Sequence, residues 1–501
     1  MKALMIQGTA SGVGKSVLVA GLCRLLARNG VRVAPFKPQN MSNNAAVTVD
    51  GGEIGRAQAL QAFACGIEAT VDMNPVLLKP EADCTSQLIV RGRVVGKLES
   101  ARFREDRQQW LEIVQISFDR LCSQYDVVLV EGAGSPAEPN LRAGDIANMG
   151  FAEAADIPVW LVGDIDCGGV FASLTGTLAI LSASERQRVQ ALVINRFRGY
   201  LSLLDDGLQW LEQQTGKPVA GVIPWLPLEL PEEDAPYRLG KQPGKAAASL
   251  HIAVITCPRM SNCDDFDPLA SEPAISLRFI HRSDQMQPAD LVILPGSKHV
   301  AADLAWLRAE GFDKALEHHL RYGGRILGIC GGMQMLGQAI IDDTGVEGGG
   351  RIAGLNWLDI TTQMLPEKTL KRIDATAAWP AAVPVHGYEI HYGDDHPDPA
   401  LFPFSHRSAD GQILGTYLHG LFASGAFRAA WLAEMGVTTG TGEDHAHRIM
   451  ASLDLLADTL EQHIAPDLLA PLLASRMRRD ECANKAAMDT TNHSHSSLRH
   501  E

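Results

Sequence analysis

Two series of short apolar runs, separated by glycine-rich turns and amphipathic segments, constrain the fold of this chain most strongly. Apolar runs of about four to eight residues bounded by turn residues are typical of buried strands. Strands that alternate with helices indicate a parallel α/β sheet. The runs lie at residues 2–7, 31–34, 125–130, 157–162 and 189–194 in the first series, and at 251–256, 275–280, 290–294 and 325–329 in the second.

The break between the two series predicts two α/β domains, at residues 1–230 and 250–475. Residues 231–249 lie in a polar, proline-bearing stretch without periodicity, which we interpret as a linker. The polar, histidine-rich residues 476–501 are predicted to be a disordered tail. Helices are expected at 14–29, 301–322 and 445–464.

Composition narrows the class of protein. The formal net charge of −15 argues against a nucleic-acid partner, because no basic surplus is available to neutralise phosphates. Nine cysteines without a CxxC pair suggest neither a zinc site nor a disulfide framework, and fit reduced thiols in the cytoplasm. No stretch approaches the roughly 20 apolar residues that span a bilayer. We expect a soluble, cytoplasmic protein without a membrane partner.

A nucleotide-binding loop is predicted after the first apolar run. The nucleotide loop (residues 8–16) reads GTASGVGKS and opens the first expected helix, where backbone N–H groups can hold phosphates. Gly12 and Gly14 would form the turn, Lys15 would neutralise phosphates, and the Ser16 hydroxyl would bind Mg²⁺. The strict pattern needs glycine where Thr9 stands. The alternative is an ordinary glycine-rich turn that begins a helix.

Two further strand ends carry carboxylates. Glu131 follows the apolar run VVLV and begins EGAG, so it lies at the edge of the sheet where ligands bind, and it could complete a Mg²⁺ site. A plain strand-end turn is the alternative for this residue. The segment DIDCGGV, residues 164–170, could face the same edge or serve as a capping turn for a helix.

The sharpest motif is GICGGMQMLG, which places Cys330 between a strand and a helix. The flanking glycines permit the tight turn of a nucleophile elbow. A helix beginning at Gly331 would lower the thiol pKa and offer its N–H to an oxyanion. A small buried cysteine is the alternative, but three surrounding glycines argue against it. We interpret Cys330 as a nucleophile.

A histidine base is expected for this nucleophile. His419, in GTYLHGLF, follows an apolar run late in the same domain, and His386 and His391 are competing candidates. Gly296, in LPGSK at the end of another strand, could supply a second oxyanion N–H. An ordinary Pro-Gly turn is the alternative for LPGSK.

Several separate blocks together resemble a known family. GICGGMQMLG, LPGSK and GTYLHGLF resemble class I glutamine amidotransferase domains, and GTASGVGKS and VEGAG resemble dethiobiotin-synthetase-like amidoligase domains. The order of the two domains, together with FKPQNMSNN, MNPVLLKP and HGYEIHYG, is similar to the cobyric acid synthase family. The resemblance covers roughly residues 1–465 and leaves out the tail.

The resemblance implies a glutamine-hydrolysing carbon–nitrogen ligase of cobalamin biosynthesis. Such an enzyme amidates the b, d, e and g carboxylates of the corrinoid adenosylcobyrinic acid a,c-diamide, with ATP, Mg²⁺ and glutamine. It implies that Cys330 is the glutaminase nucleophile and His419 its base. Lys15 and Ser16 would hold phosphate and Mg²⁺, and Glu131 would be a metal ligand. The resemblance leaves open whether the protein forms a homo-oligomer.

Two departures and three rivals accompany this resemblance. Many triad glutaminases have a glutamate two residues after the histidine, where this chain has Leu421, so the imidazole is either oriented by another group or left poorly oriented. Cys167 stands where the family pattern suggests arginine, so DIDCGGV receives no role. The rivals are CTP synthase, a corrinoid a,c-diamide synthase, and a regulatory P-loop ATPase with an inactive glutaminase-like domain.

Overall fold

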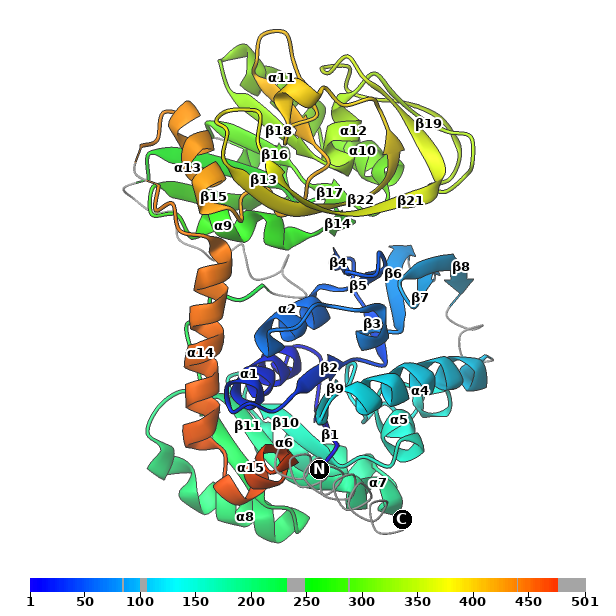
Figure 1. The fold of residues 1–501 in the computed structure, drawn as a ribbon, viewed down its shortest axis with the longest axis vertical. Coiled ribbons are helices and arrows are strands. Elements are labelled where there is room, and N and C mark those ends of the chain that lie inside the picture. The colour runs from blue at the N-terminus through cyan, green and yellow to red at the C-terminus, as the bar shows by residue number, and fades with distance from the viewer. Residues whose placement is uncertain (83–84, 100–105, 232–247, 287–288, 439, 476–501) are drawn as a thin grey trace, which may run out of the picture.

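The computed structural model describes residues 1–82, 85–99, 106–231, 248–286, 289–438 and 440–475. Two α/β halves lie one above the other, with the N-terminal half below and the C-terminal half above (Figure 1). Within these ranges, no helix is long and apolar enough to cross a membrane. The predicted tail and most of the predicted linker lie outside the described residues.

A six-stranded parallel sheet forms the centre of the first half. Its order is β12-β11-β10-β1-β9-β2, so the first strand lies in the middle. Met5 of β1 packs into one core cluster and its neighbours Leu4 and Ile6 pack into another, because both faces of the sheet are covered. The strands are β1 (Ala3–Gly8), β2 (Val33–Phe36), β9 (Val127–Glu131), β10 (Val159–Asp164), β11 (Val189–Phe197) and β12 (Val219–Pro224).

Helices and two small sheets complete this half. The helices are α1 (Lys15–Arg28), α2 (Arg56–Cys65), α4 (Arg107–Gln124), α5 (Met149–Ala154), α6 (Val170–Ile180), α7 (Ala183–Arg188) and α8 (Asp205–Thr215). One small sheet joins β3 (Gln39–Met41), β6 (Val76–Ala82), β7 (Thr85–Val90) and β8 (Arg93–Glu99). The other is the antiparallel pair β4 (Ala45–Val47) and β5 (Glu53–Gly55). Both small sheets lie between the main sheet and the upper half (Figure 1).

The second half is built on another six-stranded sheet, in the order β15-β13-β16-β18-β24-β23, with only the edge strand β23 antiparallel. Its strands are β13 (Leu250–Ile255), β15 (Ile275–Ile280), β16 (Leu291–Leu294), β18 (Arg325–Ile329), β23 (His406–Arg407) and β24 (Ile413–Thr416). Its helices are α9 (Asp267–Ala270), α10 (Val300–Ala309), α11 (Phe312–Arg321), α12 (Gly331–Leu336) and α13 (Gly425–Glu434).

Two smaller sheets flank this one. The larger contains β19 (Ala339–Asp342), β20 (Gly350–Ala353) and the long pair β21 (Thr361–Thr376) and β22 (Pro384–Asp394). The smaller is the pair β14 (Met260–Ser261) and β17 (Gly296–Ser297). The pair β21 and β22 runs along the underside of the upper half, facing the first half (Figure 1).

The last two helices return to the first half. α14 (His445–His463) descends along one side of the molecule to α15 (Pro466–Leu473), close to the N-terminus (Figure 1). Its Leu456 and Leu460 pack so closely on α1 that a Cβ on Gly21 would lie 2.6 Å from each side chain. Arg24 of α1 also pairs with Asp454 at 2.7 Å. The predicted 250–475 domain therefore ends in helices that belong to the core of the other half.

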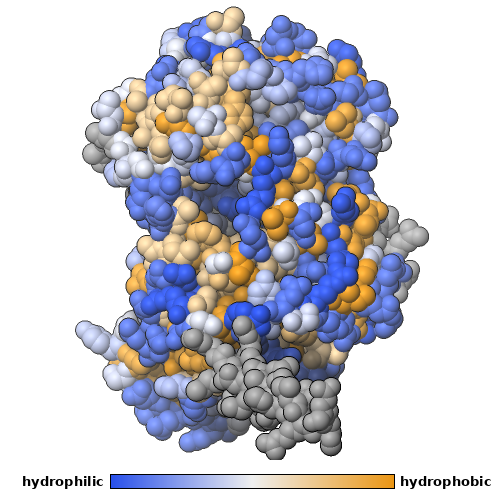
Figure 2. Space-filling view, viewed as in Figure 1, coloured by the Kyte–Doolittle hydropathy of each residue, from blue (hydrophilic) through white to orange (hydrophobic). Residues whose placement is uncertain are grey.

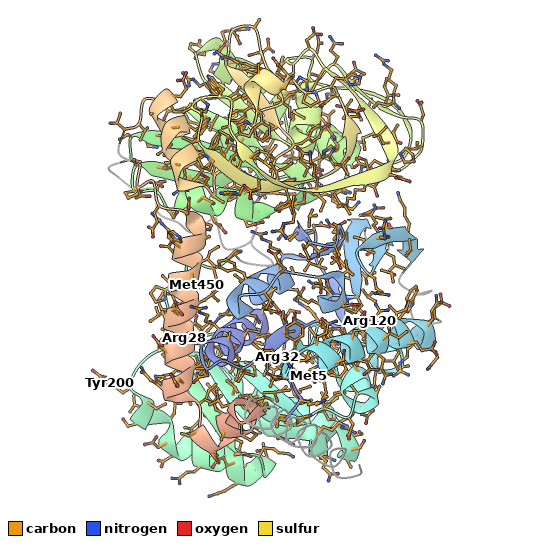
Figure 3. All side chains as sticks on the ribbon, in the orientation of Figure 1. Met5, Arg28, Arg32, Arg120, Tyr200 and Met450 are labelled. Atoms are coloured by element: carbon orange, nitrogen blue, oxygen red, sulfur yellow. The ribbon has the colours of Figure 1, made fainter. Side chains whose placement is uncertain are left out.

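Each of the nine apolar runs predicted as strands overlaps a strand, and the ends differ by no more than three residues. The helix expected at 301–322 is divided into α10 and α11, because Gly311 between them has a φ of 73°. Side chains divide between the core and the surface: Met5 in the central strand is fully buried, whereas Tyr200 is 80% exposed and points outward (Figure 3). Hydrophilic and hydrophobic side chains are intermixed over the face drawn in Figure 2.

Candidate active sites

Cys330 occupies a tight elbow between β18 and α12. Its backbone has φ 51° and ψ −112°, a conformation that is unfavourable for a residue with a side chain and that indicates a functional constraint. The neighbouring glycines are required by close packing. A Cβ on Gly332 would lie 2.1 Å from the carbonyl oxygen of Leu294, and one on Gly331 would lie 3.0 Å from the nitrogen of Ser297. The glycine pattern thus produces the expected elbow.

His419 is oriented by a carboxylate that the sequence analysis missed. Its Nδ1 lies 2.7 Å from Oδ2 of Asp265, and Oδ1 of Asp265 accepts a 2.7 Å hydrogen bond from the backbone N–H of Gly420. The side chains of His419 and Asp265 are 1% and 3% exposed. Leu421, where a glutamate was expected from related triads, packs in the hydrophobic core. Asp265 therefore provides the partner that Leu421 cannot.

The surroundings of His419 favour its protonated form. Burial lowers the pKa of His419, but the Asp265 carboxylate and the hydrogen-bonded Cys330 sulfur outweigh burial and raise the pKa to about 10. Tyr388 stacks on the imidazole with ring centroids 5.3 Å apart. The backbones of Tyr388 and His419 also exchange two hydrogen bonds, which fixes the ring position. His419 is thus placed to donate a proton at neutral pH.

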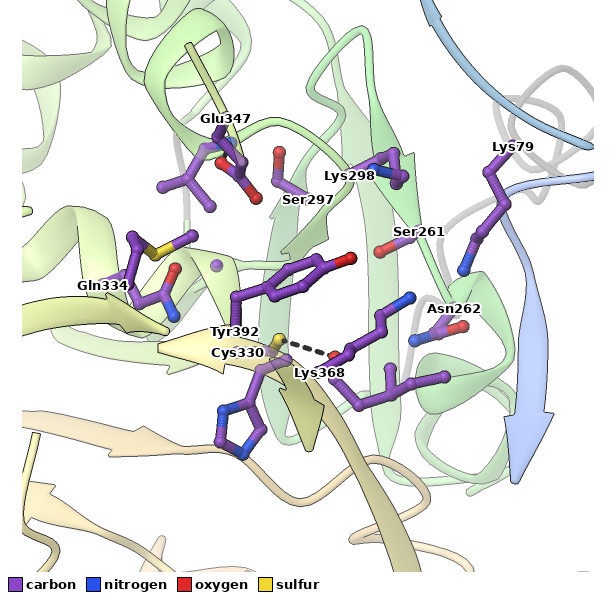
Figure 4. A pocket seen from close by; sticks show the side chains of 15 residues that line it. Lys79, Ser261, Asn262, Ser297, Lys298, Cys330, Gln334, Glu347, Lys368 and Tyr392 are labelled. Atoms are coloured by element: carbon purple, nitrogen blue, oxygen red, sulfur yellow. Dashed lines mark hydrogen bonds between the residues drawn. The ribbon is translucent and has the colours of Figure 1, made fainter. Parts of the chain in front are cut away.

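A polar pocket opens at the thiol (Figure 4). The Sγ of Cys330 donates a weak hydrogen bond to the carbonyl oxygen of Ile390, 3.7 Å away. Lys79 comes from the first half of the chain, so both halves form this pocket. The lining residues are Lys79, Ser261, Asn262, Ser297, Lys298, Val300, Cys330, Gly331, Gln334, Glu347, Met364, Lys368, Ile390, His391 and Tyr392.

Carboxylates of the first half pair with lysines around the pocket. The two oxygens of buried Glu53 lie 2.5 Å from Nζ of Lys79 and 2.7 Å from Nζ of Lys368. Burial would raise the pKa of Glu53, but the two lysines lower it to about 2. Glu81 pairs in the same way with Lys298 at 2.7 Å. Since Lys298 and Lys368 belong to the second half, these buried ion pairs join the halves beside the thiol.

Two titratable pocket residues have pKa values moved toward the neutral form. Burial raises the pKa of Glu347 to about 7, and its Oε2 accepts a 2.8 Å hydrogen bond from the N–H of Val300. Burial lowers the pKa of His391 to about 4, with its Nδ1 2.7 Å from the carbonyl oxygen of Gly393. His386, the other competing histidine, is on the surface beside Asp374.

The two glycines considered as oxyanion donors lie close to Cys330 and His419. Gly331 lines the pocket at the first turn of α12. A Cβ on Gly296 would lie 3.1 Å from Cε1 of His419 and 3.0 Å from Oγ of Ser261. The next residue, Ser297, lines the pocket and brings its backbone nitrogen next to Gly331. Backbone groups of β17 and α12 therefore converge beside Cys330.

The nucleotide loop joins β1 to α1 at the carboxyl edge of the first sheet. Gly12 and Gly14 have φ values of 71° and 93°, the left-handed region that favours glycine. A Cβ on Gly14 would lie only 2.3 Å from Nδ2 of Asn195. The ammonium of Lys15 lies across the loop and donates a 2.9 Å hydrogen bond to the carbonyl oxygen of Gly134. The loop therefore has the glycine-dependent backbone expected of a phosphate cradle.

Glu131 lies beside this loop in a buried polar cluster. Its Oε1 accepts hydrogen bonds from Oγ of Ser16 at 2.7 Å and Nζ of Lys37 at 2.9 Å, and its Oε2 accepts one from Gln61 at 2.6 Å. Burial would raise the pKa of Glu131, but Lys37 and these hydrogen bonds lower it. The described residues contain no group of three or more His, Cys, Asp and Glu side chains able to hold a metal by themselves.

The segment at residues 164–170 forms a turn stabilised by its own carboxylate. Asp164 accepts a 2.9 Å hydrogen bond from the N–H of Asp166 and pairs with Arg196 at 2.7 Å. Cys167 is exposed, and its Sγ lies 3.6 Å from Asp164. These contacts hold the turn itself, and no side chain of the segment caps α6, whose N-cap residue is Gly169.

Comparisons with known proteins agree with this arrangement. Residues 4–237 match the CobQ/CobB/MinD/ParA nucleotide binding domain, and residues 251–427 match the CobB/CobQ-like glutamine amidotransferase domain. The chain is 60% identical over 472 residues to the cobyric acid synthase of Halorhodospira halophila, which covers 94% of this chain and 98% of the relative. It is 51% identical over 477 residues to the cobyric acid synthase of Rhodobacter capsulatus, covering 93% and 98%.

The fold and the sites define a nucleotide-binding ligase with its own glutamine amidotransferase domain. More particularly, the chain belongs to the cobyric acid synthase family. The residues considered from the sequence form two separate groups. Cys330, His419, Gly331 and Gly296 gather in the upper half, and the nucleotide loop and Glu131 gather in the lower half.

Proposed function

We propose that this enzyme converts adenosylcobyrinic acid a,c-diamide to cobyric acid by amidating its b, d, e and g carboxylates with ATP and glutamine. The observation that carries the proposal is the Cys330–His419–Asp265 group in one half and the nucleotide loop in the other, joined by an interface that shares the glutaminase pocket. Relatives at 60% and 51% identity support the corrinoid as substrate.

In the glutaminase half, the Cys330 thiolate attacks the carboxamide carbon of glutamine. The N–H groups of Gly331 and Gly296 stabilise the oxyanion, with the N–H of Ser297 close by. Protonated His419 donates its proton to the departing ammonia, and the neutral imidazole then activates the water that hydrolyses the thioester. Asp265 holds the imidazole in the required tautomer. The products are glutamate, ammonia and the regenerated thiolate.

The pocket residues suit the amino-acid end of glutamine. The carboxylate of Glu347 would pair with the α-ammonium group, and the pocket lysine Lys298 carries a charge that suits the α-carboxylate. Gln334 offers an amide to the rest of the substrate. Because all three line the pocket that holds the Cys330 thiol, one glutamine can bind them while its side-chain amide reaches the sulfur.

In the synthetase half, the nucleotide loop would bind ATP through the N–H groups of Gly12 and Gly14 and through the ammonium of Lys15. The oxygens of Ser16 and Glu131, 2.7 Å apart, are hard donors that fit Mg²⁺ completed by phosphates and water. When bound, Mg²⁺ neutralises phosphate charge. The γ-phosphoryl group passes to the corrinoid carboxylate and gives an acyl phosphate and ADP. Ammonia then displaces phosphate and forms the amide.

The division of labour is tested with Cys330→Ala. This variant should lose glutamine-dependent amidation and keep amidation supported by high ammonium, each amide being counted by mass spectrometry of the corrinoid. Cys257→Ala, another buried cysteine of the same half, is the matched control and should keep both activities. Loss of ammonium-dependent amidation in Cys330→Ala would contradict the separation of the two sites. Absence of glutamate release and of corrinoid amidation by the unaltered enzyme would favour a binding module.

A further inference from the structure

The first half of the chain reaches directly into the glutaminase group. Asn262 lines the Cys330 pocket, and its Nδ2 lies 3.2 Å from Nε2 of His419. The Oδ1 of the same Asn262 accepts a 3.1 Å hydrogen bond from the backbone N–H of Ala45 in β4. Asn44, one residue earlier, accepts a hydrogen bond from the N–H of Cys263 at 3.3 Å. A segment of the synthetase half therefore supports the loop that carries the catalytic carboxylate.

Arg56, the first residue of α2, makes a charged contact with this loop. Its guanidinium pairs with Asp264 at 2.7 Å and lies 5.9 Å from the ring centroid of Tyr388. Asp264 directly precedes Asp265, and Tyr388 stacks on the imidazole of His419. Arg56 therefore touches the neighbours of His419 on two sides without lining the glutamine pocket itself.

The same helix contacts the nucleotide site. Gln61 donates hydrogen bonds to Oε2 of Glu131 at 2.6 Å and to the backbone carbonyl oxygen of Ser16 at 3.2 Å. Gln58 donates to Oε2 of Glu131 at 3.4 Å. α2 has ten residues and is about 15 Å long, so it directly connects the phosphate-binding end of α1 with the glutaminase loop.

We propose that Arg56 is a positioning residue of the glutaminase, and that α2 couples glutamine hydrolysis to the state of the nucleotide site. A displacement of Glu131 or Ser16 when nucleotide binds moves Gln61, and α2 passes that movement to Arg56. Arg56 then changes the placement of Asp264 and Tyr388, which lie on either side of the His419–Asp265 pair. This inference rests on the proposed function and adds a route between its two sites.

These contacts are less well explained if their only role is to hold the two halves together. The halves are already joined by the apolar cluster of Ala45, Val47, Tyr388 and Ile390 and by the buried pairs that Glu53 and Glu81 form with lysines of the second half. A buried ion pair adds little net stability because desolvation opposes its attraction, so its value lies in fixing geometry. Arg56 fixes two groups that touch the catalytic residues.

The test compares Arg56→Gln and Arg56→Lys with Arg372→Gln in the full-length enzyme. Arg372 forms an interface ion pair with Glu68 that is half exposed and does not line the Cys330 pocket, so it is the matched control. Glutamate release is measured with and without ATP and adenosylcobyrinic acid a,c-diamide, and amidation is measured with glutamine and with ammonium. Kinetics as a function of glutamine concentration separate kcat from KM.

Arg56→Gln should lower kcat for glutamine hydrolysis under full turnover about tenfold, which is a typical size for coupling between sites. It should also abolish the stimulation of glutamine hydrolysis by ATP and corrinoid. KM for glutamine and ammonium-dependent amidation should stay within about twofold of the unaltered enzyme, because Arg56 touches neither substrate. Arg56→Lys should recover part of the stimulation, since it keeps the charge facing Asp264. Arg372→Gln should behave like the unaltered enzyme.

Full stimulation in Arg56→Gln would overturn the inference and leave the proposed function intact. Equal losses of glutamine- and ammonium-dependent amidation would also overturn it, because they would show that Arg56 only maintains the fold. An unaltered enzyme that amidates no corrinoid would instead contradict the proposed function. The three outcomes are therefore distinguishable.

Discussion

Replacing Asp265 with asparagine should disable the glutaminase while leaving the shape of the site almost unchanged. The Oδ1 of Asp265 accepts from the N–H of Gly420, so the asparagine carbonyl oxygen would keep that contact. Its NH₂ group would then face Nδ1 of His419, where the carboxylate oxygen now lies at 2.7 Å. An imidazole that accepts at Nδ1 carries its proton on Nε2, which is the wrong tautomer for a base.

The size of the effect follows from the pKa of His419. The difference between about 10 and the ordinary value of 6.5 corresponds to about 5 kcal/mol in favour of the imidazolium, at about 1.36 kcal/mol for each pKa unit. The Asp265 carboxylate and the Cys330 sulfur share this stabilisation. Loss of the carboxylate removes the largest of the contributions that raise this pKa, and the wrong tautomer brings the loss in rate toward about 10⁴-fold.

The assay is glutamate release at saturating glutamine, in the presence of ATP and corrinoid, for Asp265→Asn and for the surface control Asp284→Asn. We expect kcat to fall about 10² to 10⁴-fold in the first and to stay unchanged in the second. Amidation with high ammonium should be unaffected in both, because the synthetase site is separate. A kcat for Asp265→Asn within about threefold of the unaltered enzyme would refute the role of this carboxylate.

Three further predictions concern the synthetase, glutamine binding and stability. Lys15→Met should abolish amidation with glutamine and with ammonium alike, measured by corrinoid mass, because both require phosphoryl transfer. The KM for glutamine should fall as pH rises through about 7, since Glu347 is protonated below that pH and ionised above it; Glu347→Gln should remove this dependence. Leu460→Ala should destabilise the enzyme by about 2–5 kcal/mol, because a fully buried leucine of α14 leaves a cavity against α1; a lower Tm in thermal denaturation measures it, and an unchanged Tm would contradict the packing.

The elements that local patterns encode could be predicted from the sequence. Buried strands are short apolar runs, and the elbow of Cys330 and the nucleotide loop place several glycines between a strand and a helix. Each of these signals lies within a few consecutive residues, so neither the rest of the fold nor a partner segment is needed to interpret it. His419 could be selected among 16 histidines only with the help of the family resemblance.

The third member of the proposed catalytic group could not be predicted in this way. Asp265 lies 154 residues before His419, and the two meet because the segments that follow the parallel strands β13 and β24 leave the same edge of one sheet. The acidic pair in NCDDF was the one local signal, and nothing in it distinguishes Asp265 from Asp264, which faces Arg56 instead. Long-range pairings of this kind depend on tertiary packing.

The return of α14 to the first half has a consequence for how the enzyme is made. Chains emerge from the ribosome from the N-terminus, and domains generally fold as they appear. The face of α1 that receives Leu456 and Leu460 stays uncovered until the whole glutaminase half has been synthesised. We therefore expect the ATP-using half to mature only after its ammonia source exists. A nascent or truncated chain would then not use ATP to form acyl phosphates while no ammonia is available to react with them.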